Sequence, residues 1–532
     1  MKRFFTFFLS VCVGVIQPLL AQNDDTDRPW RSPESCTSVM VGKKASVDGS
    51  VMTSHTCDSW YRTWLTMRPA KTYTKDTVEA VYEGRMHTEY PDDQTKMTEK
   101  GRIKQIRSTY KYLDTSYPCL NEKQLGIGET TIEGKTELIN PKAMFMIEEL
   151  QRIALERCST ARQAIKLIGE LIEKHGYADY GECLTIADPK EVWQMEIFGV
   201  GKDKIGGVWA ARRIPDDHIG VSANIPRIGK ILKDPEYFMA SANVSAAAKE
   251  LGFWDGKEPF VFWKAYSKDK KAYMIREYFI LNYFAPSLGL KFDDREEMPF
   301  SVKPDKPVDV TDVMAVLRQT YEGTEYDMLK NLKVEVKDKK TEKTDTITSP
   351  AANPWMTTDM VTMLNGIKKD VVKRQRTIAV PQCAYSTVIQ LRSWLPDAIG
   401  GVVWFAFDNP AQSPRIPIFA GNTQLPKSFE VCGQHRFRTD AAVWSFRRAN
   451  KLASVRWGRN RANIEEAVKR FTDKGVRELP WVEAEYKKIL TAHGAEEATK
   501  FLNEYTADFA GAAMLRWQEM GDEYWSKYQM GF

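Results

Sequence analysis

The sequence predicts an α+β protein whose sheets carry helices on their outer faces. Residues 36–58 have the pattern of a β-hairpin, and residues 141–158 and 161–175 have the spacing of amphipathic helices. Strand-like runs lie on either side of those helices. The chain has 532 residues, of which 43% are hydrophobic, so it can bury one large core or two domains.

The hairpin segment, CTSVMVGKKASVDGSVMTSHTCD, joins three reactive side chains. Apolar and small residues alternate in its first arm, and Asp48-Gly49 supplies a tight turn. A turn centred there returns the chain to the level of Cys36. We therefore expect the imidazole of His55 and the carboxylate of Asp58 beside the Cys36 thiol.

The residues before the hairpin have the form of a removable leader. Residues 1–21 combine a basic start, an apolar run and a small-residue cut site, which is typical of a secretory signal peptide. Residues 22–35 are polar and not periodic, and we interpret them as a presegment removed on maturation. Cleavage after Ser35 would expose Cys36 as an N-terminal residue whose α-amine can take the thiol proton. We expect an exported protein, periplasmic or extracellular.

Composition excludes several other classes. The net charge of +5 is small and spread along the chain, so nucleic acid is not an expected partner, and no second apolar run could span a membrane once the signal is removed. The eight cysteines are too few for a disulfide scaffold, although an exported chain could form one or two bridges. No CxxC or HExxH motif is present. We expect no metal and no cofactor.

The remaining elements follow from periodicity. Residues 334–349 are charged and threonine-rich, which indicates an exposed loop or hairpin, and the chain becomes helical and aromatic from about residue 439. We expect strands over residues 119–134, 183–187, 191–198, 208–213, 219–223, 376–391 and 399–407. Further helices are expected over residues 273–284, 310–321, 482–507 and 508–528.

Several segments resemble one known family. The start at residue 36 is similar to that of the N-terminal-cysteine dipeptidases of the dipeptidase A type. Later blocks match in the same order: NEKQLGIGETT (121–131), IADPKEVWQMEIFG (186–199), VSANIPRIG (221–229), YEGTEYD (321–327) and the run from RTIAVPQ at 376 to Asp408. The resemblance implies a four-layer αββα N-terminal nucleophile hydrolase sandwich. Residues 36–532 would form its catalytic domain, with additional C-terminal helices from about 439.

The resemblance also implies roles for single residues. More distantly, the chain is similar to penicillin V acylases and bile salt hydrolases, whose hairpin places an arginine and an aspartate after the nucleophile. Asp58 matches that aspartate, and His55 stands where the arginine would be. Asn224 matches an oxyanion-hole asparagine, and a backbone N–H near Thr131 would be the second donor. Arg276 could match a further active-site arginine.

The residues and the resemblance together favour a cysteine amide hydrolase, and the resemblance implies more specifically a dipeptidase, with a dipeptide or other small amide as its partner. Glu129 could hold the amino terminus of a dipeptide. Two alternatives stay open: an amidase of the same fold acting on N-acyl amides of bile-salt or penicillin type, and a non-catalytic exported binding protein. The sequence also leaves a homo-oligomer open. Structurally, Asp58 could cap a turn, and His55, Glu129 or Asn224 could be ordinary strand-end or turn residues.

Overall fold

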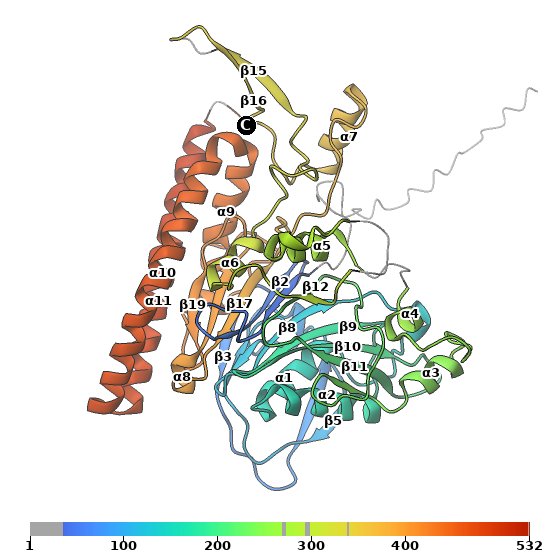
Figure 1. Ribbon diagram of the computed structural model, residues 1–532. Coiled ribbons are helices and arrows are strands. Elements are labelled where there is room, and N and C mark those ends of the chain that lie inside the picture. The colour runs from blue at the N-terminus through green and yellow to red at the C-terminus, as the bar shows by residue number, and fades with distance from the viewer. Residues whose placement is uncertain (1–35, 269–272, 293–297, 338–339, 530, 532) are drawn as a thin grey trace, which may run out of the picture.

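Two antiparallel sheets form the centre of the molecule (Figure 1). The computed structural model describes residues 36–268, 273–292, 298–337, 340–529 and 531. The predicted signal peptide and presegment lie outside these residues. The α+β class is confirmed.

The seven-stranded sheet has the order β14-β12-β1-β2-β17-β18-β19. The hairpin predicted from residues 36–58 supplies its two central strands. Its strands are β1 Ser38–Val41, β2 Val51–Cys57, β12 Ile219–Ser222, β14 Ser301–Val302, β17 Tyr385–Leu391, β18 Gly401–Phe407 and β19 Ile416–Phe419.

The eight-stranded sheet has the order β13-β11-β10-β9-β8-β7-β6-β3. It faces the first sheet, because β2 packs on β8 and β9 while β1 packs on β8 and β10. Its strands are β3 Thr66–Arg68, β6 Tyr112–Asp114, β7 Leu120–Asn121, β8 Gly126–Thr131, β9 Glu182–Ala187, β10 Val192–Gly199, β11 Gly207–Arg213 and β13 Phe238–Ala240.

Helices cover the outer faces of both sheets. The helices α1 (Ile147–Arg157) and α2 (Ala161–His175) lie on the eight-stranded sheet. On the seven-stranded sheet, α5 (Ile275–Phe284) packs on β12 and α6 (Val310–Val316) packs on β17. The remaining helices among the described residues are α3 Val244–Glu250, α4 Phe262–Tyr266, α7 Thr358–Ile367, α8 Asp397–Gly400, α9 Ala442–Val455, α10 Trp457–His493 and α11 Ala495–Lys527.

Two further hairpins lie outside the sheets. The strands β4 (Val78–Glu83) and β5 (Thr98–Lys104) pair near α1. The strands β15 (Lys333–Lys337) and β16 (Thr344–Thr348) form a fully exposed hairpin that projects from the top of the molecule beside α7 (Figure 1). This hairpin confirms the exposed excursion predicted for residues 334–349.

Alternation along the two central strands separates two cores. Met40 and Val51 belong to the core between the sheets, whereas Val39, Val41 and Met52 pack with α5 and α6 on the outer face. Successive side chains of a strand point to opposite faces, so both faces of β1 and β2 are buried. The continuous apolar run of β18 is buried for the same reason.

Some predicted boundaries were wrong. The first helix begins at Ile147 rather than at residue 141, because Phe145 forms a β-bridge with Tyr177 and keeps the preceding segment extended. The C-terminal helices divide at Gly494, which has φ +87° and closes α10, so the predicted helices 482–507 and 508–528 are wrong. The helix at 161–175 is confirmed, with Thr160 as its N-cap.

The seven cysteines among the described residues are all buried and free, so the bridges allowed by the sequence do not form between them. Within the same residues, none of the helices is both long and apolar enough to cross a membrane.

Candidate active site

The hairpin brings Cys36 to the gap between the two sheets. Val41 pairs with Met52 and Thr37 bridges Thr56, so the residue before Thr37 lies level with the end of β2. Ser38, two residues along, donates a hydrogen bond to the Glu129 carbonyl of the eight-stranded sheet. Because strand residues alternate in direction, Cys36 faces the same sheet.

The thiol of Cys36 lies in a compact cluster with His55 and Glu129. One ligand atom from each of the three residues lies within 4.8 Å of the others. His55 comes from β2 and Glu129 from β8, so the cluster joins the two sheets. Nε2 of His55 is 3.2 Å from Oε2 of Glu129, yet neither atom has a hydrogen-bond partner. All three side chains are buried, with exposures of 1%, 1% and 0%.

Aromatic rings hold the imidazole in place. The rings of Tyr117 and Tyr385 meet His55 edge to face, with centroids 5.3 and 5.7 Å away. Tyr385 is on β17, the neighbour of β2, and its hydroxyl accepts a hydrogen bond from the Tyr117 backbone N–H. The imidazole therefore has little freedom to rotate.

The surroundings of Cys36 disfavour its thiolate. Burial raises the pKa of the thiol well above its usual range, and the negative charges of Glu129 and Asp58 add to this effect. The backbone N–H of Asp58 acts in the opposite direction by hydrogen bonding to the sulfur. This holds for the chain in which Cys36 is still joined to Ser35.

Arg276 binds the backbone around the nucleophile. It is buried on α5, and its Nη1 donates to the Cys36 carbonyl (2.6 Å) and to Oγ1 of Thr37 (3.0 Å). Its Nη2 donates to the Ala223 carbonyl (3.1 Å) and to Oδ1 of Asn224 (2.7 Å). Burial lowers the pKa of the guanidinium to about 10, with a smaller contribution from Arg376. One side chain thus fixes β1 against the end of β12.

Asn224 lies just beyond β12 with φ +68°, in the left-handed region that asparagine tolerates. Its Nδ2 donates to the Thr131 carbonyl at 2.6 Å. The structure therefore links Asn224 and Thr131 through the Thr131 carbonyl, and one of the two amide hydrogens is used in that bond. The Thr131 hydroxyl donates to Oε1 of Glu129 (3.3 Å), which connects this pair to the thiol cluster.

Asp58 follows directly after β2, which ends at Cys57. Within one strand, residues 55 and 58 would point to opposite faces of the sheet. Because β2 ends before Asp58, the carboxylate is free of this constraint. Oδ2 of Asp58 accepts hydrogen bonds from Thr56 (2.7 Å) and from Nη2 of Arg376 (2.8 Å). All seven predicted site residues therefore belong to one connected group.

Sequence reasoning missed four groups that complete this arrangement: the hydroxyls of Thr37 and Thr56, the rings around His55, and Arg376. Arg376 begins the block RTIAVPQ, which supported the family resemblance without being assigned a role. It supplies a cation at Asp58, while His55 takes the strand position where an arginine was expected.

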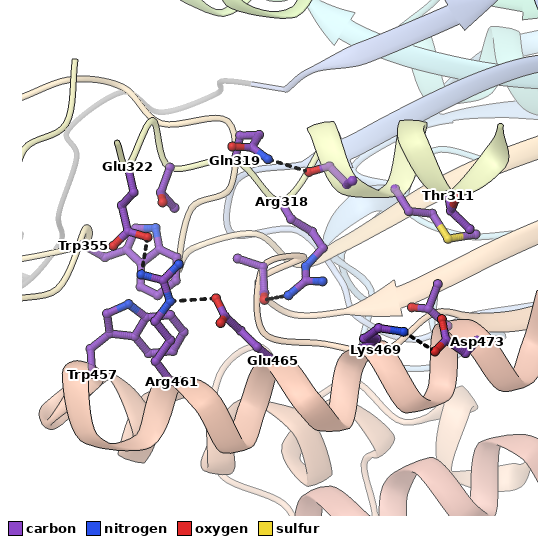
Figure 2. A pocket seen from close by; sticks show the side chains of 15 residues that line it. Thr311, Arg318, Gln319, Glu322, Trp355, Trp457, Arg461, Glu465, Lys469 and Asp473 are labelled. Atoms are coloured by element: carbon purple, nitrogen blue, oxygen red, sulfur yellow. Dashed lines mark hydrogen bonds and ion pairs between the residues drawn. The ribbon is translucent and has the colours of Figure 1, made fainter. Parts of the chain in front are cut away.

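The pocket of Figure 2 is separate from this group of residues. It has a volume of about 480 Å³ and lies between α6 and α10. Arg461 pairs there with Glu322 and Glu465, and Lys469 pairs with Asp473. None of the predicted site residues lines it. Arg318, the third cation of this pocket, donates instead to the Ala411 carbonyl. Because each of the three cations is bound within the protein, we interpret the pocket as a junction that anchors α10.

An apolar cavity of similar volume lies nearer to Asp58. Trp60, two residues beyond Asp58, lines it together with Met356, Trp444 and the segment before Cys383. Cys383 itself interacts electrostatically with Asp58.

A family model described as Peptidase family C69 matches residues 35–470. The chain belongs to Peptidase family C69. It is a cysteine-type peptidase, and the resemblance to the dipeptidase A type is confirmed.

Curated relatives of this peptidase extend over most of its length. A "Probable dipeptidase" of Latilactobacillus sakei is 26% identical over 502 residues, which cover 89% of this chain and 93% of the relative. A "Probable dipeptidase" of Salmonella dublin is 26% identical and covers 73% of this chain and 81% of its own. "Dipeptidase A" of Lactobacillus helveticus is 21% identical over 85% of this chain and 91% of the relative.

Proposed function

We propose that the protein is an exported dipeptidase that uses Cys36 as an N-terminal nucleophile. Membership of the peptidase family and relatives named as dipeptidases support the reaction and the substrate class. The observation that carries the assignment of residues is the convergence of Arg276, Glu129 and His55 on Cys36. Asn224 joins this group through its hydrogen bond with Arg276.

Two observations support removal of the leader. The family match begins at residue 35, so nearly all of the leader falls outside the part of the chain that resembles the family. Cys36 is 1% exposed while it is joined to Ser35. Cleavage at that bond frees an α-amine whose pKa is ordinarily near ~8, suited to take a proton from a thiol at neutral pH.

The layering supports an N-terminal nucleophile hydrolase sandwich. Two antiparallel sheets face each other, helices lie outside them, and the proposed nucleophile precedes a central strand. Residues 442–527 add three helices against the edge formed by β18 and β19.

In the proposed reaction, the amine takes the Cys36 proton and the thiolate attacks the scissile carbonyl. The second amide hydrogen of Asn224 and a backbone N–H near Thr131 stabilise the oxyanion. The loss of one such donor costs about 2.7–4 kcal/mol in the barrier. The ammonium then protonates the leaving amine, and water hydrolyses the acyl-enzyme by the reverse steps.

Glu129 supports a dipeptide rather than an acylated substrate. The free α-ammonium of a dipeptide is two bonds from the carbonyl carbon that the sulfur attacks. A carboxylate oxygen of Glu129 lies within 4.8 Å of that sulfur, which is a suitable distance for pairing with the ammonium. An N-acyl amide carries no charge at this position.

The decisive experiment determines the mature N-terminus and the need for Cys36. We expect the intact mass of the exported protein to correspond to a chain starting at Cys36, with no dipeptide hydrolysis by Cys36→Ala. Cys432→Ala is the control, because Cys432 is a buried free cysteine that contacts Thr63 away from the cluster. A fully active protein that retains Ser35 would refute the amine as base, and activity in Cys36→Ala would refute the nucleophile.

Glu129→Gln separates the dipeptidase from the amidase alternative. We expect kcat/KM for dipeptides to fall about ten- to hundredfold, the usual value of a charge-assisted hydrogen bond, while hydrolysis of an N-acyl amide changes little. Equal losses on both substrate classes would favour the amidase of the same fold.

A further inference from the structure

The buried cluster of Cys36, His55 and Glu129 contains the donor set of a metal site. A thiol, an imidazole and a carboxylate are the three ligand types that Zn²⁺ uses in proteins. Their ligand atoms lie within 4.8 Å of one another, and the His55 and Glu129 atoms are already 3.2 Å apart. Zinc–ligand bonds of about 2.0–2.3 Å place neighbouring ligand atoms roughly 3.3–3.6 Å apart, so only the sulfur has to approach.

Two of these atoms have no hydrogen-bond partner. Nε2 of His55 and Oε2 of Glu129 are buried, with neither solvent nor a hydrogen bond. Buried polar atoms left unsatisfied cost free energy, typically about 1–3 kcal/mol each. Each of the two residues has a ligand atom within 4.8 Å of the sulfur, so a single cation between the three residues would satisfy both side chains together.

The surroundings already orient the ligands. The rings of Tyr117 and Tyr385 fix the imidazole, and the Thr131 hydroxyl donates to the other oxygen of Glu129. Such outer contacts are what hold metal ligands in place. A thiolate and a carboxylate together carry two negative charges, which a divalent ion neutralises.

We propose that Cys36, His55 and Glu129 bind a Zn²⁺-type ion that occupies the nucleophile and reversibly inhibits the peptidase. The inhibition rests on the proposed function, whereas the binding does not. Coordination replaces the thiol proton by the metal, and that proton is released to solvent.

Maturation would strengthen the site. Arg276 donates a hydrogen bond to the Cys36 carbonyl. The backbone atom of Cys36 that is left to bind a metal ion is therefore its amino nitrogen. Once the bond to Ser35 is cut, the amine and the thiolate of Cys36 can chelate one ion together. With His55 and Glu129 they complete the four ligands of a tetrahedral zinc site.

Cobalt(II) is the probe for binding, because it substitutes for zinc and gives a charge-transfer absorption only when a thiolate coordinates it. We expect each mature chain with reduced cysteines to bind one cobalt ion, and we expect Zn²⁺ to displace it. Cys36→Ser should lose the charge-transfer band, and Cys432→Ser should keep it. His55→Ala and Glu129→Gln should weaken binding about ten- to hundredfold, with circular dichroism confirming that each variant is folded.

A band that persists in Cys36→Ser, or unchanged affinity in both His55→Ala and Glu129→Gln, would overturn the site. Dipeptide hydrolysis should stop in saturating Zn²⁺ and recover with a chelator, and full activity in saturating Zn²⁺ would overturn the inhibition. A protein that binds cobalt through Cys36 but hydrolyses no dipeptide would refute the proposed function and leave the metal site standing.

Discussion

At the scale of single residues, Arg276 shows how one side chain organises the site. Its guanidinium reaches acceptors on the segments around Cys36 and Asn224, which are far apart in sequence. A planar fork with five N–H donors can bind several acceptors in fixed directions, and an ammonium cannot. The family resemblance suggested this residue, but no pattern around it predicted these contacts.

We therefore expect Arg276→Lys to lower kcat for dipeptides by at least about tenfold, because one pre-organised contact in the site is worth about 1.4 kcal/mol or more. The matched control is Arg318→Lys, since Arg318 donates to the single carbonyl of Ala411 away from the cluster. Steady-state kinetics and thermal unfolding of both variants separate catalysis from stability. An equal loss of kcat in the two variants would contradict the role of Arg276.

The pKa of Cys36 gives a second prediction at this scale. Burial raises it most, and Glu129 is the next cause. A raised thiol pKa means that the reactive thiolate forms only at higher pH. Glu129→Gln removes one negative charge, so the pH profile of Cys36 alkylation by iodoacetamide should shift to lower pH. A profile that does not move would show that Glu129 does not influence the sulfur.

At the scale of elements, α1 carries two neighbouring buried carboxylates with opposite behaviour. Glu149 pairs with Arg85 and Arg152, and the pKa of its carboxyl is lowered despite its burial. Neither side-chain oxygen of Glu148 has a hydrogen bond, and burial raises the pKa of its carboxyl to about 8. The helix therefore contains one group stabilised when charged and one stabilised when neutral.

The pH dependence of stability follows from these directions. In the folded state Glu148 is protonated below about pH 8, whereas in the unfolded state it is ionised above about pH 4.5. Its contribution to folding stability is therefore full at low pH and is lost as pH rises through 8. We expect Glu148→Gln to raise the unfolding temperature at pH 8 and to change it little at pH 5.

Glu149→Gln is the paired control for that experiment. The lowered pKa of Glu149 stabilises the fold above its unfolded pKa and is lost as pH falls. Loss of one partner of a buried ion pair costs about 3–5 kcal/mol, so this variant should unfold at lower temperature at neutral pH. Thermal unfolding followed by circular dichroism checks both. The same response in both variants would contradict the assignment.

At the scale of the whole molecule, one core joins the site to the C-terminal helices. The core between the sheets continues from Met40 on β1 to Phe509 and Trp517 on α11. The helices α10 and α11 run side by side along the edge of the seven-stranded sheet (Figure 1). The C-terminal segment is therefore part of the structure that supports β1 and β2.

A substitution at Gly475 tests whether the C-terminal helices and the sheets form one cooperative core. A Cβ there would lie 2.8 Å from the ring of Trp404, which is buried on β18. We expect Gly475→Ala to destabilise the protein although alanine favours a helix, and to lower the temperatures of activity loss and of unfolding together. Gly511→Ala on α11 meets nothing within 4 Å and should stabilise by about 1 kcal/mol. Separate transitions for activity and unfolding would contradict a single cooperative core.

Local sequence patterns determined much of the secondary structure and the family of this protein. Alternation and Asp48-Gly49 predicted the central hairpin, helical spacing and a Thr160 cap predicted α2, and the ordered blocks predicted the family. These features depend on residues close together in the chain, where periodicity and turn chemistry act directly. Helix ends were less predictable, because the bridge between Phe145 and Tyr177 displaced the start of α1.

The tertiary structure alone decided how the site is assembled. The carboxylate of Glu129, the fork of Arg276 and the cation of Arg376 reach Cys36 and Asp58 from separate segments of the chain. No motif spacing encodes such a cluster, because its members become neighbours only when the two sheets and α5 pack together. Burial then strengthens the electrostatic interactions within the cluster. The low dielectric of the interior, together with the charge of Glu129, raises the pKa of the Cys36 thiol.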